Sequence, residues 1–335
     1  MKSKWLFVLF LAFAICLMGI SGCKKEGDAK TLKLGHSLPE GHPVHTAMEY
    51  MAALVYYRSE GAIRIEIIPT EQLGSEREMI EQVQSGFLDM CKTSTSPLES
   101  FVPEIAVYSL PYIFRDRDHY WNVLKGPVGE DLKKICENKN IVGLCYYDSG
   151  SRSFYTKDKP ILKPEDLAGM QIRVMQSKTA MDTVEALGAS PTPIAWGELY
   201  TSLQQGVVDG AENNPPSLYV SRHYEVCKHY SLDEHTMVPD IVLMSKNSWD
   251  EKLTQKEQEL IQKAVNDSME FQILLWEQYT KMSMDEVQKA GVKVYTPDKA
   301  AFREKVRGMH ESYLNSEDPI QKTIGEYIKR IHEVK

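Results

Sequence analysis

Segments with the hydrophobic pattern of β-strands alternate with segments that have the pattern of helices along most of the chain. Short apolar or alternating runs of the kind found in β-strands lie at residues 31–36, 63–68, 88–91, 141–147 and 171–175. Segments with apolar side chains at the three- and four-residue spacing of helices lie at residues 43–58, 76–85, 179–187 and 196–204. Ser75 precedes one of these segments and is a suitable N-cap. Strands that alternate with helices predict an α/β fold with largely parallel sheets.

Two stretches interrupt this alternation and predict where the chain crosses between two lobes. Ser149-Gly150-Ser151 follows the apolar run at 141–147, and Met237-Val238-Pro239 precedes another at 241–244. A helical segment at 253–291 contains no proline and is long enough to brace both lobes. The resulting division puts residues 31–149 and 239–278 in lobe I, and residues 150–238 and 279–335 in lobe II.

The first 30 residues have the composition of an export signal. Two lysines precede an apolar run that ends at Ile20, and this run is shorter than the about 20 residues that a membrane-spanning helix needs. The small residues before Cys23 resemble a lipobox, the cleavage signal of bacterial lipoproteins. The resemblance implies that residues 1–22 are a signal peptide, that Cys23 is lipidated, and that residues 23–30 form a tether. An uncleaved anchor helix is the alternative, and both interpretations put the rest of the chain outside the cytoplasm.

Composition and charge exclude several classes of function. The chain has 335 residues, which suits two domains better than one, and its formal net charge is −8. An acidic protein lacks the basic footprint of a nucleic-acid binder, and it needs a local positive pocket to bind an anion. The cysteines at 91, 136, 145 and 227 do not have metal-ligand spacing, and no motif of a catalytic triad or phosphate loop stands out. We therefore expect a binding protein without a metal or cofactor, and not an enzyme.

Arg173 is the first candidate for binding chemistry. It alternates with Ile172 and Val174 in a predicted strand, so its side chain points to one face of the sheet while theirs point to the other. Ligands of open α/β sheets bind where such strands end. The planar guanidinium donates two parallel hydrogen bonds and stays charged, which suits a carboxylate. An ordinary surface arginine on an edge strand is the alternative interpretation.

A second cluster of polar residues lies at 209–216, where Gly210 allows a sharp turn. The amides of Asn213 and Asn214 offer donors and acceptors close together, and two prolines stiffen the segment that follows. Trp196 begins a predicted helix, and its indole could stack on the carbon skeleton of a ligand. A plain turn and a core tryptophan are the alternatives.

Several separated motifs together resemble one family of transport proteins. They are residues 34–36 (LGH), 72–74 (QLG), 110–114 (LPYIF), 167–173 (LAGMQIR) and 206–213 (GVVDGAEN). In this order they resemble the substrate-binding subunits of tripartite ATP-independent periplasmic (TRAP) transporters, the DctP family. The resemblance covers about residues 31–330.

The resemblance implies a periplasmic-binding-protein fold, with two α/β lobes that close on a ligand in a hinge cleft and a long helix that spans both. It implies that Arg173 pairs with the ligand carboxylate and that Asn213 hydrogen-bonds it. Arg152 matches a second arginine of the family, which is coupled with Glu212 and His235 in a network that links the lobes. The implied partners are a small carboxylate and the membrane permease subunits, and the implied location is the periplasm or the outer face of the cytoplasmic membrane.

Further candidates follow from the same motifs and from the residues themselves. His36, Glu76, Ser94, Gln176 and Trp196 match positions of the family cleft. Lys92 comes just after a predicted buried strand, where a lysine is unusual unless it is paired or faces a cleft, and a structural salt bridge is the alternative. Asn214 is added as the second of the paired amides. Glu76 would accept hydrogen bonds from hydroxyls and repel a second ligand carboxylate, unless Lys92 offset its charge. We therefore expect a sugar acid such as a uronate. A C4-dicarboxylate, a keto acid and a ligand-presenting role beside a sensor are the alternatives.

Overall fold

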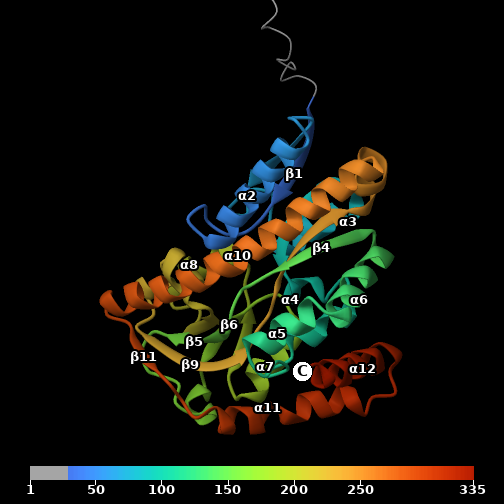
Figure 1. Cartoon of the computed structure of the whole chain (residues 1–335). Coiled ribbons are helices and arrows are strands. Elements are labelled where there is room, and N and C mark those ends of the chain that lie inside the picture. Colours follow the sequence, from blue (N-terminus) through green and yellow to red (C-terminus); the bar gives the residue numbers. More distant parts are fainter. Residues whose placement is uncertain (1–28) are drawn as a thin grey trace, which may run out of the picture.

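The first of two β-sheets organises lobe I in the computed structural model, which describes residues 29–335 (Figure 1). Its strand order is β2-β1-β3-β10-β4. The strands are β1 (Lys30–Gly35), β2 (Ile63–Ile68), β3 (Met90–Ser94), β4 (Ile141–Tyr147) and β10 (Asp240–Ser245). The predicted signal peptide and Cys23 lie outside the described residues. The sheet is built from every strand predicted before residue 150, together with one strand that returns much later in the chain.

The second sheet organises lobe II and has the order β11-β9-β5-β8-β6-β7. Its strands are β5 (Arg152–Thr156), β6 (Gln171–Val174), β7 (Ser190–Pro193), β8 (Gly210–Asn213), β9 (His229–Thr236) and β11 (Lys293–Tyr295). Buried apolar side chains cover both sheets on both faces, in two clusters for each lobe. Each lobe is therefore a layered α/β unit with its own core.

Both sheets are mixed, which corrects the prediction of largely parallel sheets. Strand β10 runs antiparallel to both β3 and β4, and β5 runs antiparallel to both β8 and β9. The reason is the route of the chain, because β5 and β10 are the strands that follow each crossing between the lobes. Asp240, the first residue of β10, pairs with Ser94, the last residue of β3. A strand that enters a sheet where its neighbour ends must run in the opposite direction.

The two predicted crossings between lobes are confirmed. Residues 149–151 join β4 to β5, and residues 237–239 join β9 to β10. The Ser149 hydroxyl donates a hydrogen bond to the Val238 carbonyl, so the two crossings lie side by side. Gly150 has a φ of +59°, and a Cβ there would lie 2.9 Å from Nε1 of Trp276. A glycine is thus required where the hinge passes the long helix.

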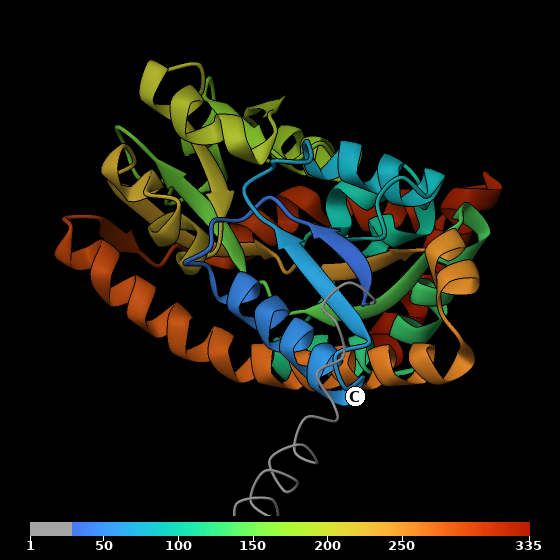
Figure 2. The ribbon, with the colours of Figure 1, turned by 90° about the horizontal axis from the view of Figure 1, so that it is seen from above.

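Helix α10 (Gln255–Lys289) spans the two lobes, as predicted (Figures 1 and 2). It packs on α2 (Pro43–Arg58) in lobe I and on α9 (Pro215–Val220) in lobe II. Thr254 and Glu257 form a capping box at its start. The Gln272 side chain bonds both the N–H and the carbonyl of Asp148, at 2.7 and 2.8 Å, so the helix is tied to the first crossing.

The remaining helices cover the sheets. They are α3 (Glu76–Ser85), α4 (Thr95–Leu98), α5 (Arg117–Leu124), α6 (Pro127–Ile135), α7 (Lys178–Ala186), α8 (Trp196–Gln205), α11 (Lys299–Leu314) and α12 (Pro319–Glu333), with short 3-10 turns at Pro103–Ser109, Cys136–Lys139, Pro164–Leu167 and His223–Glu225 and a π-turn at Ser248–Lys252. Ser75 caps α3, as predicted. No helix among residues 29–335 combines the length and apolar character needed to cross a membrane.

The position of α12 differs from the predicted division, which put all of residues 279–335 in lobe II. Ile324, Tyr327, Ile328 and Ile331 lie on one face of α12 and belong to a core cluster of lobe I. The helix packs on α6 and on the 3-10 turn at Pro103–Ser109, both of which are in lobe I. The chain therefore returns to lobe I after α11, because that lobe holds the apolar surface that this face covers.

Candidate ligand-binding site

A narrow cavity between the lobes collects most of the predicted site residues. Its lining consists of Ser37, Leu38, His42, Glu76, Lys92, Ser94 and Asp240 from lobe I, Ser149 from the hinge, Arg152, Arg173, Met175, Trp196, Asn213, Asn214 and Ser217 from lobe II, and Trp276 from α10. The cavity has a volume of only about 40 Å³. The lobes therefore stand close together across the site, and polar groups of both face the same small space.

Arg173 brings an incompletely paired guanidinium to this cavity. It lies on β6, its residue is only 2% exposed, and its Nε donates to the Ile194 carbonyl at 2.9 Å. Its Nη1 is buried and has no hydrogen-bond partner among residues 29–335. The indole of Trp196 lies 5.5 Å from the guanidinium carbon. Burial lowers the pKa of Arg173 from its usual value. A buried cation with a free donor is costly unless an anion completes its coordination, so this is not an ordinary surface arginine.

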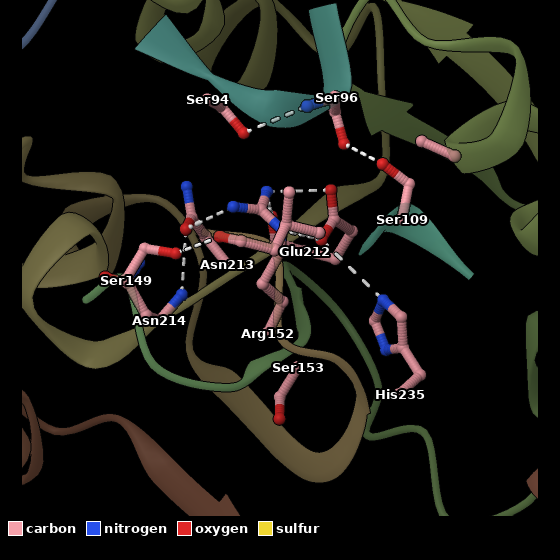
Figure 3. A network of polar contacts seen from close by, with 12 residues as sticks. Ser94, Ser96, Ser109, Ser149, Arg152, Ser153, Glu212, Asn213, Asn214 and His235 are labelled. Carbon is pink, nitrogen blue, oxygen red and sulfur yellow. Dashed lines mark hydrogen bonds and ion pairs between the residues drawn. The ribbon is translucent and has the colours of Figure 1, made fainter. Parts of the chain in front are cut away.

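Arg152, in contrast, is fully engaged with its neighbours (Figure 3). Its Nε and Nη2 donate to the Glu212 carboxylate at 2.5 and 2.9 Å, and Nη2 also donates to the Glu212 carbonyl at 2.7 Å. Its Nη1 donates to Oδ1 of Asn213 at 2.8 Å. Burial raises the pKa of Glu212, but the nearby Arg152 and His235 outweigh it and hold that pKa at about 2. Arg152 thus lines the cavity while its nitrogens are committed to Glu212 and Asn213.

Asn213 is oriented by these bonds. Its Oδ1 accepts from Arg152 and also from the backbone N–H of Asn214, at 2.9 Å. Both acceptor positions of the amide oxygen are occupied, so its NH₂ group remains for a ligand in the cavity. Asn214 uses its own Oδ1 to cap α9, accepting from the N–H of Ser217 at 2.9 Å. The two amides therefore offer donors rather than acceptors.

The residues of the predicted network, Arg152, Glu212 and His235, all belong to lobe II. They border a small cavity together with Ser96 and Ser109 of lobe I, and a link between the lobes through this network stays a prediction. The three residues stand on the neighbouring strands β5, β8 and β9, and Nε2 of His235 is 3.6 Å from Glu212. Tyr112 of lobe I binds this segment of β9 twice: its N–H donates to the His235 carbonyl at 2.8 Å, and its hydroxyl donates to the Asp233 carbonyl at 3.0 Å. The network therefore fixes the positions of these three side chains on the lobe II side of the site.

His235 is charged in this network. Its Nδ1 lies 2.7 Å from Oδ2 of Asp233, and its ring stacks on Phe154 at 4.6 Å. Burial lowers the pKa of His235, but the carboxylates of Asp233 and Glu212 outweigh it and raise the pKa to about 9. A folded-state pKa above the unfolded one gives stability that is complete below pH 6.5 and is lost as the pH rises through about 9.

We therefore predict that the free energy of unfolding falls as the pH is raised from 6.5 to above 9. The rise of the His235 pKa from 6.5 to about 9 corresponds to about 3 kcal/mol. Urea titrations over this range should show the loss, and His235→Gln should flatten it. His229→Gln, on the same strand but partly exposed, should keep the parent profile. A parent-like pH profile in the His235 variant would contradict the assignment of a charged imidazolium.

Lobe I contributes the acidic wall of the cavity. Nζ of Lys92, whose residue is 2% exposed, lies 2.7 Å from Asp240 and 3.6 Å from Glu76. Glu76 also accepts from the Ser37 hydroxyl and the Ser94 N–H, both at 3.2 Å. Burial raises the pKa of Asp240 to about 6, against the lowering effect of Lys92. Two carboxylates thus share one ammonium, and this wall carries a net negative charge opposite Arg173.

Two predicted residues lie away from the cavity. His36 is completely buried, with Nε2 2.9 Å from Nδ1 of His45, and its Nδ1 accepts the Leu38 N–H. Its neighbours Ser37 and Leu38 line the cavity instead. Gln176 is half-buried and borders a separate, open hollow that residues of both lobes line. In both cases the sequence identified a position next to the ligand cavity, but the predicted residue itself does not line that cavity.

Asp240, His42, Ser217 and Trp276 line the cavity and were not predicted. Asp240 had a usable signal, because it directly follows the second crossing and precedes an apolar run, where a lone carboxylate is unusual. Trp276 lies far along α10, and its approach to the hinge requires the three-dimensional fold. A larger hollow of about 730 Å³ lies on the other side of Trp276. Lys281 and Lys299, two of the five lysine and arginine side chains that line it, face Asp285 and Glu234.

The fold and the site together define a class of protein. Two lobes on a hinge enclose a cavity with a free guanidinium on one wall and acidic groups on the other, which suits a protein that encloses a small polar anion. The chain belongs to the DctP family, described as bacterial extracellular solute-binding protein, family 7, whose model matches residues 34–317. It is a solute-binding protein of the TRAP type and not an enzyme. The family works outside the cytoplasm, with a TRAP permease as partner and small carboxylates as ligands.

Comparisons with individual proteins agree with this membership. The uncharacterized protein YiiZ of Salmonella typhimurium is 41% identical over 275 residues, which cover 82% of this chain and 84% of that protein. The TRAP periplasmic solute-binding protein of Xanthobacter autotrophicus, solved with β-D-galacturonate, has a TM-score of 0.86 and 39% identity, covering 91% of this chain and 100% of that one. The counterpart from Pseudomonas putida, solved with D-glucuronate, has a TM-score of 0.86 and 33% identity, covering 91% and 98%.

Proposed function

We propose that this TRAP solute-binding protein captures a sugar acid, with a hexuronate as the favoured ligand. Arg173 and the NH₂ group of Asn213 bind its carboxylate from the side of lobe II. The observation that carries the proposal is the buried Nη1 of Arg173, which lacks a partner in the described part of the chain although Arg173 lines the cavity. A carboxylate supplies the acceptors that this fork needs.

The opposite wall favours hydroxyls over a second carboxylate. Glu76 and Asp240 accept hydrogen bonds from hydroxyl groups, whereas a ligand anion there would be repelled by two carboxylates that share a single Lys92. The galacturonate and glucuronate in the related structures combine one carboxylate with several hydroxyls, which supports the same ligand class here. A C4-dicarboxylate would need a second cation, and an aliphatic keto acid would leave the acidic wall without donors.

Ligand capture leads to transport in this proposal. The lobes close because the bound acid touches both, and the closed form docks on the membrane permease. The lipobox-like segment supports lipidation of Cys23, which would hold the protein at the membrane surface. A role beside a membrane sensor is the second candidate. Uptake assays with and without the permease genes distinguish the two.

We predict that galacturonate and glucuronate raise the melting temperature of the protein, whereas succinate and malate do not. Galactose serves as the matched control, because it carries the hydroxyls without the carboxylate that Arg173 needs. At a ligand concentration of about one hundred times Kd, binding adds about 2.7 kcal/mol to the free energy of unfolding. The protein is unfolded in guanidinium and refolded first, so that co-purified ligand is removed. Stabilisation by succinate or malate alone would sink the sugar-acid proposal.

A further inference from the structure

Helix α8 starts without a capping side chain of its own. Its N-cap residue is Ala195, whose methyl group cannot accept a hydrogen bond. The neighbouring helices α3, α7 and α10 instead have Ser75, Ser177 and Thr254 at this position. The first N–H groups of any helix need acceptors from elsewhere, so the uncapped start of α8 needs a partner.

That partner comes from the other lobe. Oε2 of Glu71, in the lobe I segment between β2 and α3, accepts the N–H of Gly197 at 2.9 Å. A carboxylate at this place is also attracted by the positive end of the helix dipole. A Cβ on residue 197 would lie 2.5 Å from Oε2 of Glu71, so a larger residue there would displace the carboxylate from this position. The helix of lobe II is therefore capped by a side chain of lobe I.

The backbone that presents Glu71 is itself unusual. Thr70 and Glu71 have φ values of +56° and +55°, a left-handed conformation that residues other than glycine rarely adopt. Their N–H groups donate to the carbonyls of Leu38 and His36, at 3.2 and 3.1 Å. Leu38 lines the ligand cavity. The surrounding structure thus holds a strained pair of residues in place next to the site, with the carboxylate aimed at the opposite lobe.

The capped end of α8 is also the part that touches the binding arginine. Trp196, the first residue of the helix, has its indole 5.5 Å from the guanidinium carbon of Arg173. Both line the cavity. A second glutamate of lobe I makes a similar contact, since Oε1 of Glu99 accepts the N–H of Thr179 at the start of α7, at 3.0 Å. Lobe I therefore places carboxylates on the starts of two helices of lobe II.

From this geometry we infer that Glu71 is a positioning residue that caps α8 across the cleft and slows ligand release. Closing the lobes completes the cap, and the completed cap holds Trp196 against Arg173. Opening the lobes breaks the cap, so it adds to the barrier that a bound ligand meets on leaving. The inference rests on the proposed solute-binding function, but not on the identity of the ligand.

The test is the release rate of galacturonate from Glu71→Ala, followed by stopped-flow tryptophan fluorescence. Loss of a helix cap corresponds to an increase in the rate of about 5- to 30-fold. Glu81→Ala is the matched control, because Glu81 is an exposed lobe I residue whose carboxylate faces Arg77 on its own helix. Its release rate should equal that of the parent, and an unchanged rate in Glu71→Ala overturns the inference.

A second variant separates capping across the cleft from simple stability of α8. Ala195 has φ −59° and ψ 155°, close to the φ −62° and ψ 165° of the N-cap Ser75, so Ala195→Asp gives the helix a cap within lobe II. In the double variant with Glu71→Ala, the Gly197 amide should regain slow hydrogen exchange while ligand release stays fast. Recovery of slow release would show that local helix stability suffices. Hydrogen exchange in the single variant needs no ligand, so a failure of the parent to bind galacturonate counts against the sugar-acid proposal alone.

Discussion

Replacing Arg173 by alanine should weaken galacturonate binding by a hundred- to a thousandfold or more. The ligand carboxylate would lose a buried, charge-assisted partner, and removing one member of such a pair costs about 3–5 kcal/mol. At about 1.4 kcal/mol for each tenfold change in Kd, this gives the stated range. Arg173→Lys should also lose affinity, because an ammonium cannot reproduce the two parallel hydrogen bonds of the guanidinium fork.

Isothermal titration calorimetry measures this loss directly. Arg64→Ala is the matched control, since Arg64 is an exposed residue on β2 of the other lobe, and its affinity should equal that of the parent. The ligand-free Arg173→Ala protein loses the Nε bond to the Ile194 carbonyl and the contact with Trp196, but it is relieved of a buried and incompletely paired charge, so these effects on its stability should oppose each other. An affinity within a fewfold of the parent would refute the role of Arg173 as the carboxylate-binding residue.

The elements that could be predicted from the sequence are those whose signals are local. The helices at 43–58 and 76–85 and the strands at 63–68 and 141–147 have the bounds that their periodicity predicts, and Ser75 caps its helix. The crossings between lobes were also recognised, because they break an otherwise regular alternation. Such signals are contained within a few residues and do not depend on what packs against them.

Features that depend on long-range packing could not be predicted. The face of α12 is visible as an apolar stripe, but the sequence does not say which lobe it covers. The side chain of His36 turns into the core toward His45, while Ser37 faces the cavity, and this choice depends on the loop geometry. Motifs identified the right stretches of chain, whereas the direction of each side chain is set by contacts with distant residues such as Asp240.

The largest effect on folding is expected at the pair of Arg152 and Glu212. Replacing Arg152 by methionine leaves the buried Glu212 carboxylate without its main counter-charge, and replacing Glu212 by leucine leaves the guanidinium in the same state. Each single variant should lose about 3–5 kcal/mol of the free energy of unfolding. The free energy of unfolding of a typical domain is about 5–15 kcal/mol, so this loss is a large fraction of it. Both variants should therefore unfold at much lower urea concentrations than the parent.

The double variant, Arg152→Met with Glu212→Leu, tests whether the loss of stability in the single variants comes from an unpaired buried charge. Because the two apolar side chains replace the pair together, neither charge remains buried alone, and much of the stability lost in either single variant should return. Ligand affinity should stay low in the double variant, since Oδ1 of Asn213 no longer receives the Arg152 bond that orients its amide toward the cavity. Stability losses that simply add in urea titrations would mean that the two residues act independently and that their contact is not the source of the stability.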